Sequence, residues 1–283
     1  MPLSFRFGTV GSPAATPSSP GGSVGGIRYA ASIGLDALEL AWVQGVRVSE
    51  TTCDGIRQAA EEKGIALSVH APYYINLNAD KEKWPRLRRY LMDAAFFGHL
   101  AGVTDVVFHP GTYFGRSPGE VLEVVVPRLQ DCVNELRANK NPVKLRPEMM
   151  GKPAVIGSVE DILSLARIVG VAPCIDFTHL HARNGQGSMN SYEEWAALLG
   201  EYRRELGYAA LNELHIHLSG IAYNDKGERN HLILEDSDLD FPAIFRALHA
   251  AGAKGRILCE SPVLEVDALR LKQMWKEVSG EEE

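Results

Sequence analysis

The feature that most constrains the fold is an alternation of short apolar runs with longer amphipathic runs, which occurs eight times along the chain. The apolar runs are four to eight residues long and rich in β-branched residues, which is typical of buried parallel strands. The amphipathic runs between them have helical periodicity, and serine and glycine bracket two of them at Ser158 to Gly170 and Ser191 to Gly207. We expect strands at residues 3–10, 37–40, 66–72, 105–111, 143–149, 171–177, 213–220 and 256–262.

The regular spacing of these runs decides between two architectures. Successive predicted strands begin 34, 29, 39, 38, 28, 42 and 43 residues apart, which leaves no room for an inserted domain. The sequence therefore predicts a single (β/α)8 TIM barrel that takes up residues 1–283 as one domain. The alternative is an open doubly wound sheet, which normally carries a glycine-rich phosphate loop after its first strand. The glycine-rich segment 8–26 matches neither the dinucleotide fingerprint nor the P-loop.

Composition excludes several protein classes. With 45% hydrophobic and 23% charged residues, the chain is neither disordered, collagen-like nor a coiled coil. Its net charge of −7 argues against a generic polyanion binder, although a basic face or bound metal ions would still allow one. No apolar run is long enough to span a membrane, and no signal peptide is expected. We expect a cytoplasmic protein whose four cysteines are reduced and mostly buried. They are Cys53, Cys132, Cys174 and Cys259.

Ionisable side chains stand at the ends of six consecutive predicted strands. They are His70, His109, Glu148, Asp176, His217 and Glu260, with His179 three residues after Asp176. In a barrel these strand ends converge on one face, and burying so many ionisable groups there is costly unless something compensates. Imidazoles and carboxylates without thiolates suit Zn²⁺ or Mn²⁺. Their number exceeds one tetrahedral site, so we expect more than one metal, an arrangement typical of phosphodiester hydrolysis.

The motifs around these residues resemble those of the endonuclease IV family, the class II apurinic/apyrimidinic endonucleases, within the xylose-isomerase-like barrels. The resemblance spans essentially the whole chain. Its most specific pieces are VHAPYYINL, VVFHPG, CIDFTH, HIHLSG, GERNHLILEDSDLD and ILCESP.

The resemblance implies three zinc ions and a zinc-dependent hydrolase that cleaves the phosphodiester 5′ to an abasic site during DNA base-excision repair. The implied ligand sets are His70, His109 and Glu148 for one ion, Glu148, Asp176, His217 and Glu260 for the second, and His179 and His231 for the third. The implied catalytic residues are Glu148, which holds two ions, and Glu260, which orients or deprotonates the attacking water. The implied partner is damaged double-stranded DNA, and we expect a monomer without membrane contact.

Side chains that contact the DNA are implied by the same resemblance. Tyr73 and Tyr74 lie where the family inserts side chains into the damaged duplex, and such a wedge would favour a flipped-out abasic sugar. Arg47 is a rough counterpart of a family arginine in the loop after the second strand. Lys152 and Arg229 are further expected phosphate contacts.

Two departures from the family pattern affect the third metal. After Glu148 the family usually continues Asn-Thr-Ala-Gly-Gln-Gly, whereas this chain reads MMGK. The family holds its third metal with an Asp-x-His motif, whereas the matching residues here are Arg229, Asn230 and His231. The carboxylate is therefore missing, and Glu228 is its candidate replacement. We accordingly expect two or three zinc ions, with Mn²⁺ as the alternative metal.

Three further polar residues receive structural predictions. His215 shares the strand face of His217, one layer deeper, and is expected to support the site without binding metal. His181 is expected to be a solvated loop residue. Arg146 should point into the barrel below Glu148, where a buried guanidinium needs a partner, and Glu39 is the predicted partner.

Two other functions remain open at this point. Glu148, Asp176, His217 and Glu260 alone also resemble the one-metal quartet of keto-sugar epimerases, which use paired carboxylates for proton transfer. A sugar isomerase or epimerase does not need the additional His70, His109 and His231. A non-catalytic barrel that binds nucleic acid or a partner would have no use for an intact ligand set.

Overall fold

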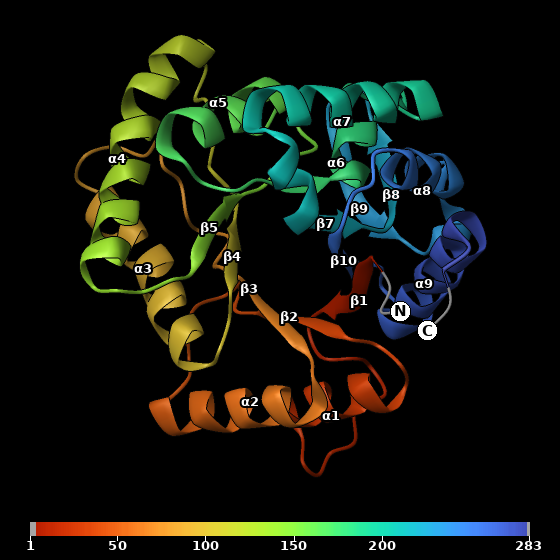
Figure 1. Cartoon of the computed structure of the whole chain (residues 1–283). Coiled ribbons are helices and arrows are strands. Elements are labelled where there is room, and N and C mark those ends of the chain that lie inside the picture. The colour runs from red at the N-terminus through yellow and green to blue at the C-terminus, as the bar shows by residue number, and fades with distance from the viewer. Residues whose placement is uncertain (1–3, 282–283) are drawn as a thin grey trace.

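Eight parallel strands form one sheet that wraps into a nearly closed barrel, as the sequence predicted (Figure 1). The computed structural model describes residues 4–281, so Leu3 of the first predicted strand lies outside the described residues. Around the barrel the order is β5, β4, β3, β2, β1, β10, β7, β6. The strands are β1 (Phe5–Val10), β2 (Ala37–Ala41), β3 (Ala66–His70), β4 (Asp105–Phe108), β5 (Lys144–Pro147), β6 (Cys174–Asp176), β7 (Leu214–Leu218) and β10 (Gly255–Cys259).

The barrel closes between β5 and β6 through a single parallel bridge, which joins Glu148 to Cys174. There the Met149 N–H donates to the Cys174 carbonyl at 3.1 Å. Strand β6 is shorter than predicted, because Pro173 supplies no N–H before it and the Asp176 side chain caps the helix that follows. The bridge lies at the carboxyl end of the strands, the end at which barrel enzymes place their active sites.

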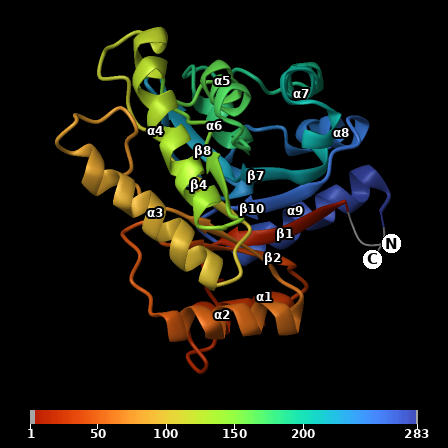
Figure 2. The same cartoon turned by 60° about the vertical axis from the view of Figure 1, so that its left-hand side comes forward.

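Helices surround the barrel in Figure 1, with α1 and α2 at one side, α3 and α4 next, then α5 and α7, and finally α8 and α9. Figure 2 shows them from another direction, in which α3 and α4 come to the front. The helices are α1 (Gly22–Ser32), α2 (Glu50–Lys63), α3 (Trp84–Leu100), α4 (Pro118–Ala138), α5 (Val159–Val169), α6 (Phe177–Ala182), α7 (Tyr192–Leu206), α8 (Phe241–Ala250) and α9 (Glu265–Ser279). The expected serine caps of α5 and α7 are confirmed, since Ser158 and Ser191 each accept the third helical N–H.

An antiparallel hairpin after β7 is one element that the sequence interpretation missed. It consists of β8 (Gly220–Asn224) and β9 (Gly227–Leu232). One short 3₁₀ helix, Tyr208–Glu213, precedes β7, and another, Leu234–Asp236, follows β9. The hairpin turn needs glycine at Gly227, where φ is +93° and an added Cβ would lie 2.2 Å from the carbonyl oxygen of Gly151. The hairpin therefore reaches the loop after β5, on the face where the strands end.

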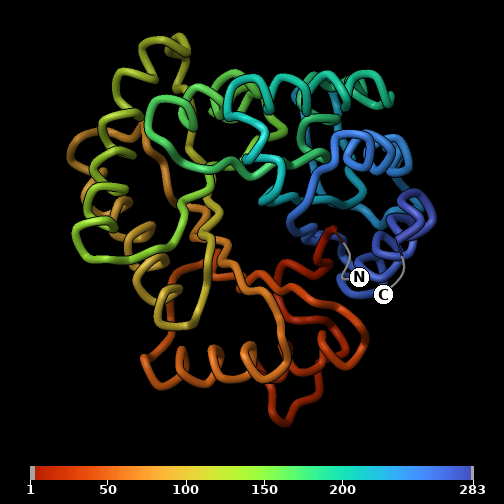
Figure 3. Tube along the Cα trace, in the orientation of Figure 1, coloured from red at the N-terminus to blue at the C-terminus, as the bar shows by residue number. Residues whose placement is uncertain are grey.

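Apolar side chains such as Ile56, Leu129 and Leu198 are buried between the strands and the helices. The trace in Figure 3 brings the beginning and the end of the described chain together, and the Ser4 N–H donates to the Glu281 carboxylate at 2.8 Å. Within residues 4–281, no helix combines the length and the apolar character needed to cross a bilayer.

Candidate metal centre

All eight predicted ligands lie at the carboxyl end of the barrel or in the segments that follow its strands. We call this set the ligand cup: His70, His109, Glu148, Asp176, His179, His217, His231 and Glu260. His179 lies on the short helix α6, which begins directly after β6, and His231 lies on β9 of the hairpin. The barrel and the hairpin therefore contribute jointly to one cluster.

Three overlapping groups in the ligand cup place their ligand atoms within 4.8 Å of one another. The first two groups match the first two predicted sets, and the third group adds Glu260 to the predicted pair. The groups are His70, His109 and Glu148, then Glu148, Asp176, His217 and Glu260, and finally His179, His231 and Glu260. The structure thus brings the predicted ligands together, while their role as ligands stays a prediction.

Glu148 occupies the centre of the ligand cup because its two oxygens face different histidines. Oε2 lies 3.3 Å from Nε2 of His70 and 3.2 Å from Nε2 of His109. Oε1 lies 3.1 Å from Nδ1 of His217 and 3.5 Å from Nδ1 of His179. Burial alone would raise the pKa of Glu148, but the surrounding histidines hold it well below its usual range. A carboxylate with this arrangement can be shared between two cations.

The donor set fits divalent cations. Asp176 is fully buried, and its Oδ2 accepts no hydrogen bond from any residue in 4–281. Burial and the neighbouring carboxylates of Glu148 and Glu260 raise the pKa of Asp176 well above its usual value. Buried carboxylates crowded in this way are compensated by protons or by metal ions. Imidazole nitrogens and carboxylate oxygens are suitable ligands for Zn²⁺ or Mn²⁺.

Glu228, the candidate replacement for the missing aspartate, lies beside His179 of the third group. Its Oε2 lies 3.2 Å from Nε2 of His179. Although burial disfavours the charged imidazole, the carboxylates of Asp176, Glu228 and Glu148 raise the pKa of His179 to about 9. The carboxylates around His179 therefore favour a positive charge at this position.

The two departures from the family pattern are structurally linked, because Gly151 holds Glu228 in place. The Gly151 N–H donates to Oε2 of Glu228 at 2.9 Å, and the Glu228 N–H donates to the Gly151 carbonyl at 3.0 Å. A Cβ on Gly151 would lie 2.2 Å from the same Oε2. The altered segment after Glu148 therefore makes room for the glutamate that approaches His179.

The predicted pairing of Arg146 with Glu39 is wrong. Arg146 donates from Nε to Asp105 at 2.5 Å, and its other nitrogens donate to the carbonyls of Pro173 and Glu213. Asp105 begins β4, and the inward-pointing guanidinium reaches down to it rather than across the barrel. Burial opposes ionisation of Asp105, but Arg146 and Arg256 hold its pKa well below the usual range.

Glu39 instead lies beneath the ligand cup among histidines. His215, buried as predicted, donates from Nε2 to Oε2 of Glu39 at 2.9 Å. Burial lowers the pKa of His215 to about 4, so its ring is neutral. The signal in the sequence was a lone glutamate within an apolar strand, which identified a buried charge without identifying its partner.

The prediction for His181 is also wrong. Its side chain is fully buried, and Nε2 lies 3.0 Å from the Asp238 carboxylate, because α6 continues the chain inward instead of forming an open loop.

The predicted DNA-contacting residues lie on the same side as the ligand cup but differ in their surroundings. Tyr73 stacks on His109 with ring centroids 5.3 Å apart, and it is 55% exposed, as is Tyr74. Lys152 lies 3.5 Å from Glu228. Arg47 and Arg229 are exposed, and the structure gives neither of them an ion pair among the described residues. Among these five residues, Tyr73 is the one whose ring stacks on a histidine of the ligand cup.

Two cavities continue from the ligand cup along the loops. The first, of about 200 Å³, is lined by His109, both tyrosines and Thr112. The second, of about 660 Å³, adjoins it at Thr112 and is lined by Phe114, Arg116 and Pro153. Phe114 is 63% exposed and has a positive φ of 52°, which an L residue rarely adopts. The sequence interpretation missed these two adjoining cavities.

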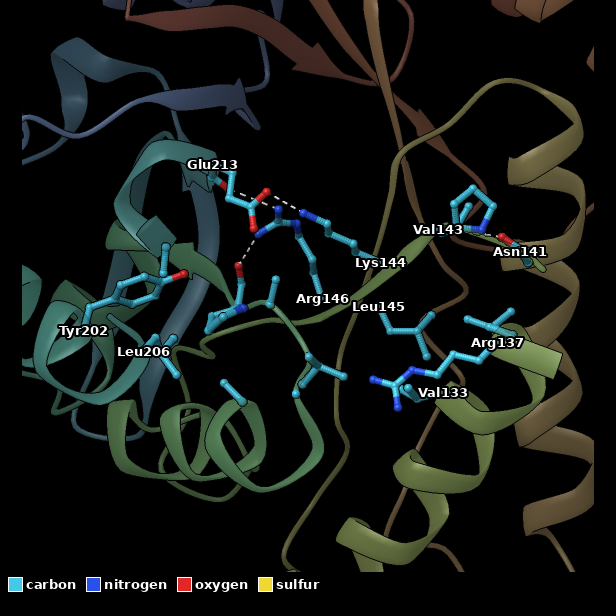
Figure 4. Close-up of a pocket in the computed structure, with 18 residues that line it drawn as sticks. Val133, Arg137, Asn141, Val143, Lys144, Leu145, Arg146, Tyr202, Leu206 and Glu213 are labelled. Carbon is cyan, nitrogen blue, oxygen red and sulfur yellow. Dashed lines mark hydrogen bonds and ion pairs between the residues drawn. The ribbon is translucent and has the colours of Figure 1, made fainter. Parts of the chain in front are cut away.

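A third cavity, of about 430 Å³, lies at the opposite, amino end of β5 and β6 (Figure 4). Leu145, Tyr202 and Leu206 form apolar walls there, and Lys144 and Arg146 point toward Glu213. It contains none of the cup residues.

Comparison with known proteins gives the family. A family model described as Xylose isomerase-like TIM barrel matches residues 27–278. An uncharacterized protein of Methanocaldococcus jannaschii is 35% identical over 96% of this chain and 97% of its own length. A probable endonuclease 4 of Staphylococcus saprophyticus is 24% identical over 72% of this chain and 73% of its own.

Solved structures show the same fold. Endonuclease IV from Thermus thermophilus superposes with a TM-score of 0.74 at 19% identity, over 98% of this chain and all of that one. A D-tagatose 3-epimerase-like protein superposes with a TM-score of 0.71 at 20% identity, over 97% of both chains. With its expected resemblance to endonuclease IV confirmed, the chain belongs to the xylose isomerase-like TIM barrel family.

Proposed function

We propose that this protein is a metal-dependent phosphodiesterase of the endonuclease IV type, which hydrolyses the DNA backbone 5′ to abasic sites in DNA base-excision repair. The observation that carries the proposal is the position of Glu148, one oxygen of which faces His70 and His109 while the other faces His217. A carboxylate shared between two ligand groups is what a site with neighbouring metals requires. An isomerase that uses one metal needs only one oxygen of Glu148 to face a group of ligands.

When bound, divalent metal ions, zinc in our proposal and manganese as the alternative, supply a nucleophile at neutral pH and neutralise charge on the phosphodiester. The first two groups of the ligand cup would hold two ions through Glu148, and His179, His231 and Glu228 would hold a third. Asp176 and His217 complete the second group from β6 and β7.

Glu260 is the residue best placed to orient or deprotonate the attacking water. Its side chain is 14% exposed, whereas that of Glu148 is 1% exposed. Burial alone would raise its pKa, but His217 and His231 lower it, so the carboxylate is ionised near neutral pH. A reachable, ionised carboxylate beside the nucleophile is suited to general base catalysis.

Damaged double-stranded DNA is the substrate that the rest of the surface favours. Tyr73 and Tyr74 expose rings at the edge of the ligand cup, where they can stack against bases exposed beside an abasic site. The two adjoining cavities, of about 200 and 660 Å³, extend past the ligand cup along the loops and leave space for more of the substrate than its reacting group. Arg47, Lys152 and Arg229 would contact phosphates, and binding would then weaken as salt increases. We further propose that the protein acts as a monomer in the cytoplasm, where its four buried cysteines would stay reduced.

A sugar isomerase or epimerase is the second candidate. The observation that favours it is the compact group of Glu148, Asp176, His217 and Glu260, which by itself can hold one metal between two carboxylates. That group leaves His70, His109 and His231 without a role, so we place this function second.

Metal counting combined with two activity assays separates the candidates. The nuclease proposal expects two or three tightly bound ions per chain and cleavage of an oligonucleotide that contains one abasic site. Glu148→Gln and Glu260→Gln should abolish that cleavage. One bound ion, an intact oligonucleotide and interconversion of ketoses would overturn the proposal in favour of the epimerase.

A further inference from the structure

Glu39 is a buried carboxylate of the barrel interior that the proposed chemistry does not use. It lies on β2, which is separated from β7 by β1 and β10, so its side chain reaches His217 across the barrel. The side chains of both residues are completely buried. Oε1 of Glu39 lies 3.0 Å from Nε2 of His217. The two groups form a close ion pair without hydrogen-bond alignment, and neither atom has a hydrogen bond to any residue in 4–281.

We infer that Glu39 is a positioning residue, which fixes the ring of His217 with Nε2 protonated and Nδ1 free to bind metal. The inference rests on the proposed metal centre and says which atom of His217 enters it. A ligating histidine commonly donates its second N–H to a carboxylate, and this partner fixes the tautomer and orientation of the ring.

The other contacts of Glu39 leave only one oxygen for this task. Oε2 accepts the Ser68 hydroxyl at 2.7 Å and Nε2–H of His215 at 2.9 Å. Ser68 is the parallel partner of Glu39 in the sheet, so this contact is set by strand register. Both donors hold the carboxylate in place without neutralising it. Oε1 therefore faces His217 with the negative charge still available.

The far side of the His217 ring explains why the tautomer matters. Nδ1 lies 3.1 Å from Oε1 of Glu148 and 3.7 Å from Oε2 of Glu260. If the single proton of a neutral ring were on Nδ1, it would donate to Glu148 and leave no lone pair for a cation. A proton held at Nε2 by Glu39 leaves the Nδ1 lone pair directed into the ligand cup.

A spectroscopic experiment reads the tautomer directly. Protein labelled with ¹⁵N-histidine is loaded with ¹¹³Cd²⁺, and one-bond and long-range nitrogen couplings are recorded by NMR. We expect ¹¹³Cd coupling to Nδ1 of His217 and a slowly exchanging, strongly downfield proton on Nε2. Cadmium bound through Nε2, or a proton on Nδ1 in the loaded protein, would overturn the inference. This measurement needs no variant and is independent of any activity on DNA.

Substitution provides the second readout. Glu39→Gln keeps the shape of the side chain but removes its charge. We expect the cadmium affinity of the group that contains Asp176 and His217 to fall about 10-fold to 100-fold, which is typical when a carboxylate that supports a ligating histidine is lost. Affinity at the His70–His109 group should stay within about twofold. Asp105→Asn, which removes another buried barrel carboxylate, is the matched control and should leave both affinities unchanged.

The two proposals fail in different ways. Unchanged affinity in Glu39→Gln, or an equal loss in Asp105→Asn, overturns the positioning role even if DNA is cleaved. If ¹¹³Cd couples to Nδ1 of His217 but the abasic oligonucleotide is not cleaved, the result supports the positioning role and counts against the proposed substrate. A wild-type chain that binds no cadmium overturns both.

Discussion

Oε2 of Glu148 lies 3.2 Å from Nε2 of His109, although the two residues follow different strands of the barrel. His109 follows β4 and Glu148 follows β5, and these strands pair in parallel with Phe108 opposite Pro147. Register alone therefore places the two residues side by side at the same barrel edge. The pairing explains how ligands scattered along the sequence meet without any local motif.

Glu148→Gln should remove the shared charge of the ligand cup. We expect the number of tightly bound ions to fall by at least one, because both groups lose an anionic ligand. Cleavage of abasic DNA should fall by at least about 10³-fold, equivalent to about 4 kcal/mol of transition-state stabilisation. Elemental analysis and single-turnover cleavage measure the two effects. Glu123→Gln, an exposed glutamate on α4, is the control. An ion count equal to that of the control would contradict the shared role.

Gly151→Ala should displace Glu228 without replacing any proposed ligand. The φ of Gly151 lies outside the left-handed region, so alanine is tolerated by the backbone, but its Cβ would lie 2.2 Å from Oε2 of Glu228. We expect occupancy of the third position to fall about 10-fold or more, as in Glu228→Gln, while two ions remain. Gly200→Ala, at a helical glycine whose Cβ would meet open space, is the matched control. If Gly151→Ala keeps full occupancy, Glu228 is only a hydrogen-bond acceptor for the loop.

Most of the fold could be predicted because strand periodicity and helix caps are local signals. The strand-end positions of His70, His109 and Glu260 also followed from the sequence, since a barrel gathers all its strand ends on one face. The contact between Gly151 and Glu228 could not be predicted, because it depends on the turn of a hairpin that packs against a distant loop.

The error at Arg146 has a similar physical origin. The alternation of side chains along β5 correctly predicted that the Arg146 guanidinium points into the barrel. This alternation does not say how far the side chain extends along the barrel axis. Asp105 begins the neighbouring strand one layer lower, and a long arginine side chain can extend to it. Glu39 had a partner in His215 that only the curvature of the closed sheet brings near.

Tyr73→Ala tests the proposed contact with DNA. The ring is half exposed and stacks on His109, so its removal should weaken binding of an abasic duplex more than it destabilises the fold. Loss of one stacking contact is worth about 1–3 kcal/mol, or about fivefold to 150-fold in Kd. Fluorescence anisotropy with abasic and intact duplexes measures the effect, and Tyr208→Ala, an exposed tyrosine outside the ligand cup, is the control. Equal affinity for both duplexes in the wild type would remove the basis for a wedge.

Asp105→Asn should lower stability and leave metal binding intact. The substitution leaves Arg146 buried without its anion, which typically costs about 3–5 kcal/mol. Since the pKa of Asp105 is held low in the folded state, its contribution is present above the unfolded pKa of about 4 and is lost only as pH falls through the lower folded value. The difference between wild type and variant in urea unfolding should therefore be the same at pH 7 and pH 5. A difference that shrinks between these values would contradict the ion pair.

His215 should make the metal-free protein less stable in mild acid. Its pKa is lowered to about 4 by burial, against about 6.5 in an unfolded chain, so between these values the unfolded state binds more protons. Stability therefore falls as pH decreases, by about 2 kcal/mol between pH 7 and pH 5 from this group alone. Urea unfolding of wild type and His215→Gln at both pH values isolates the contribution of His215 to the unfolding free energy, because both proteins contain the other histidines. We expect the variant to lose about 2 kcal/mol less than the wild type on acidification, and identical losses would mean that His215 titrates normally in the folded protein.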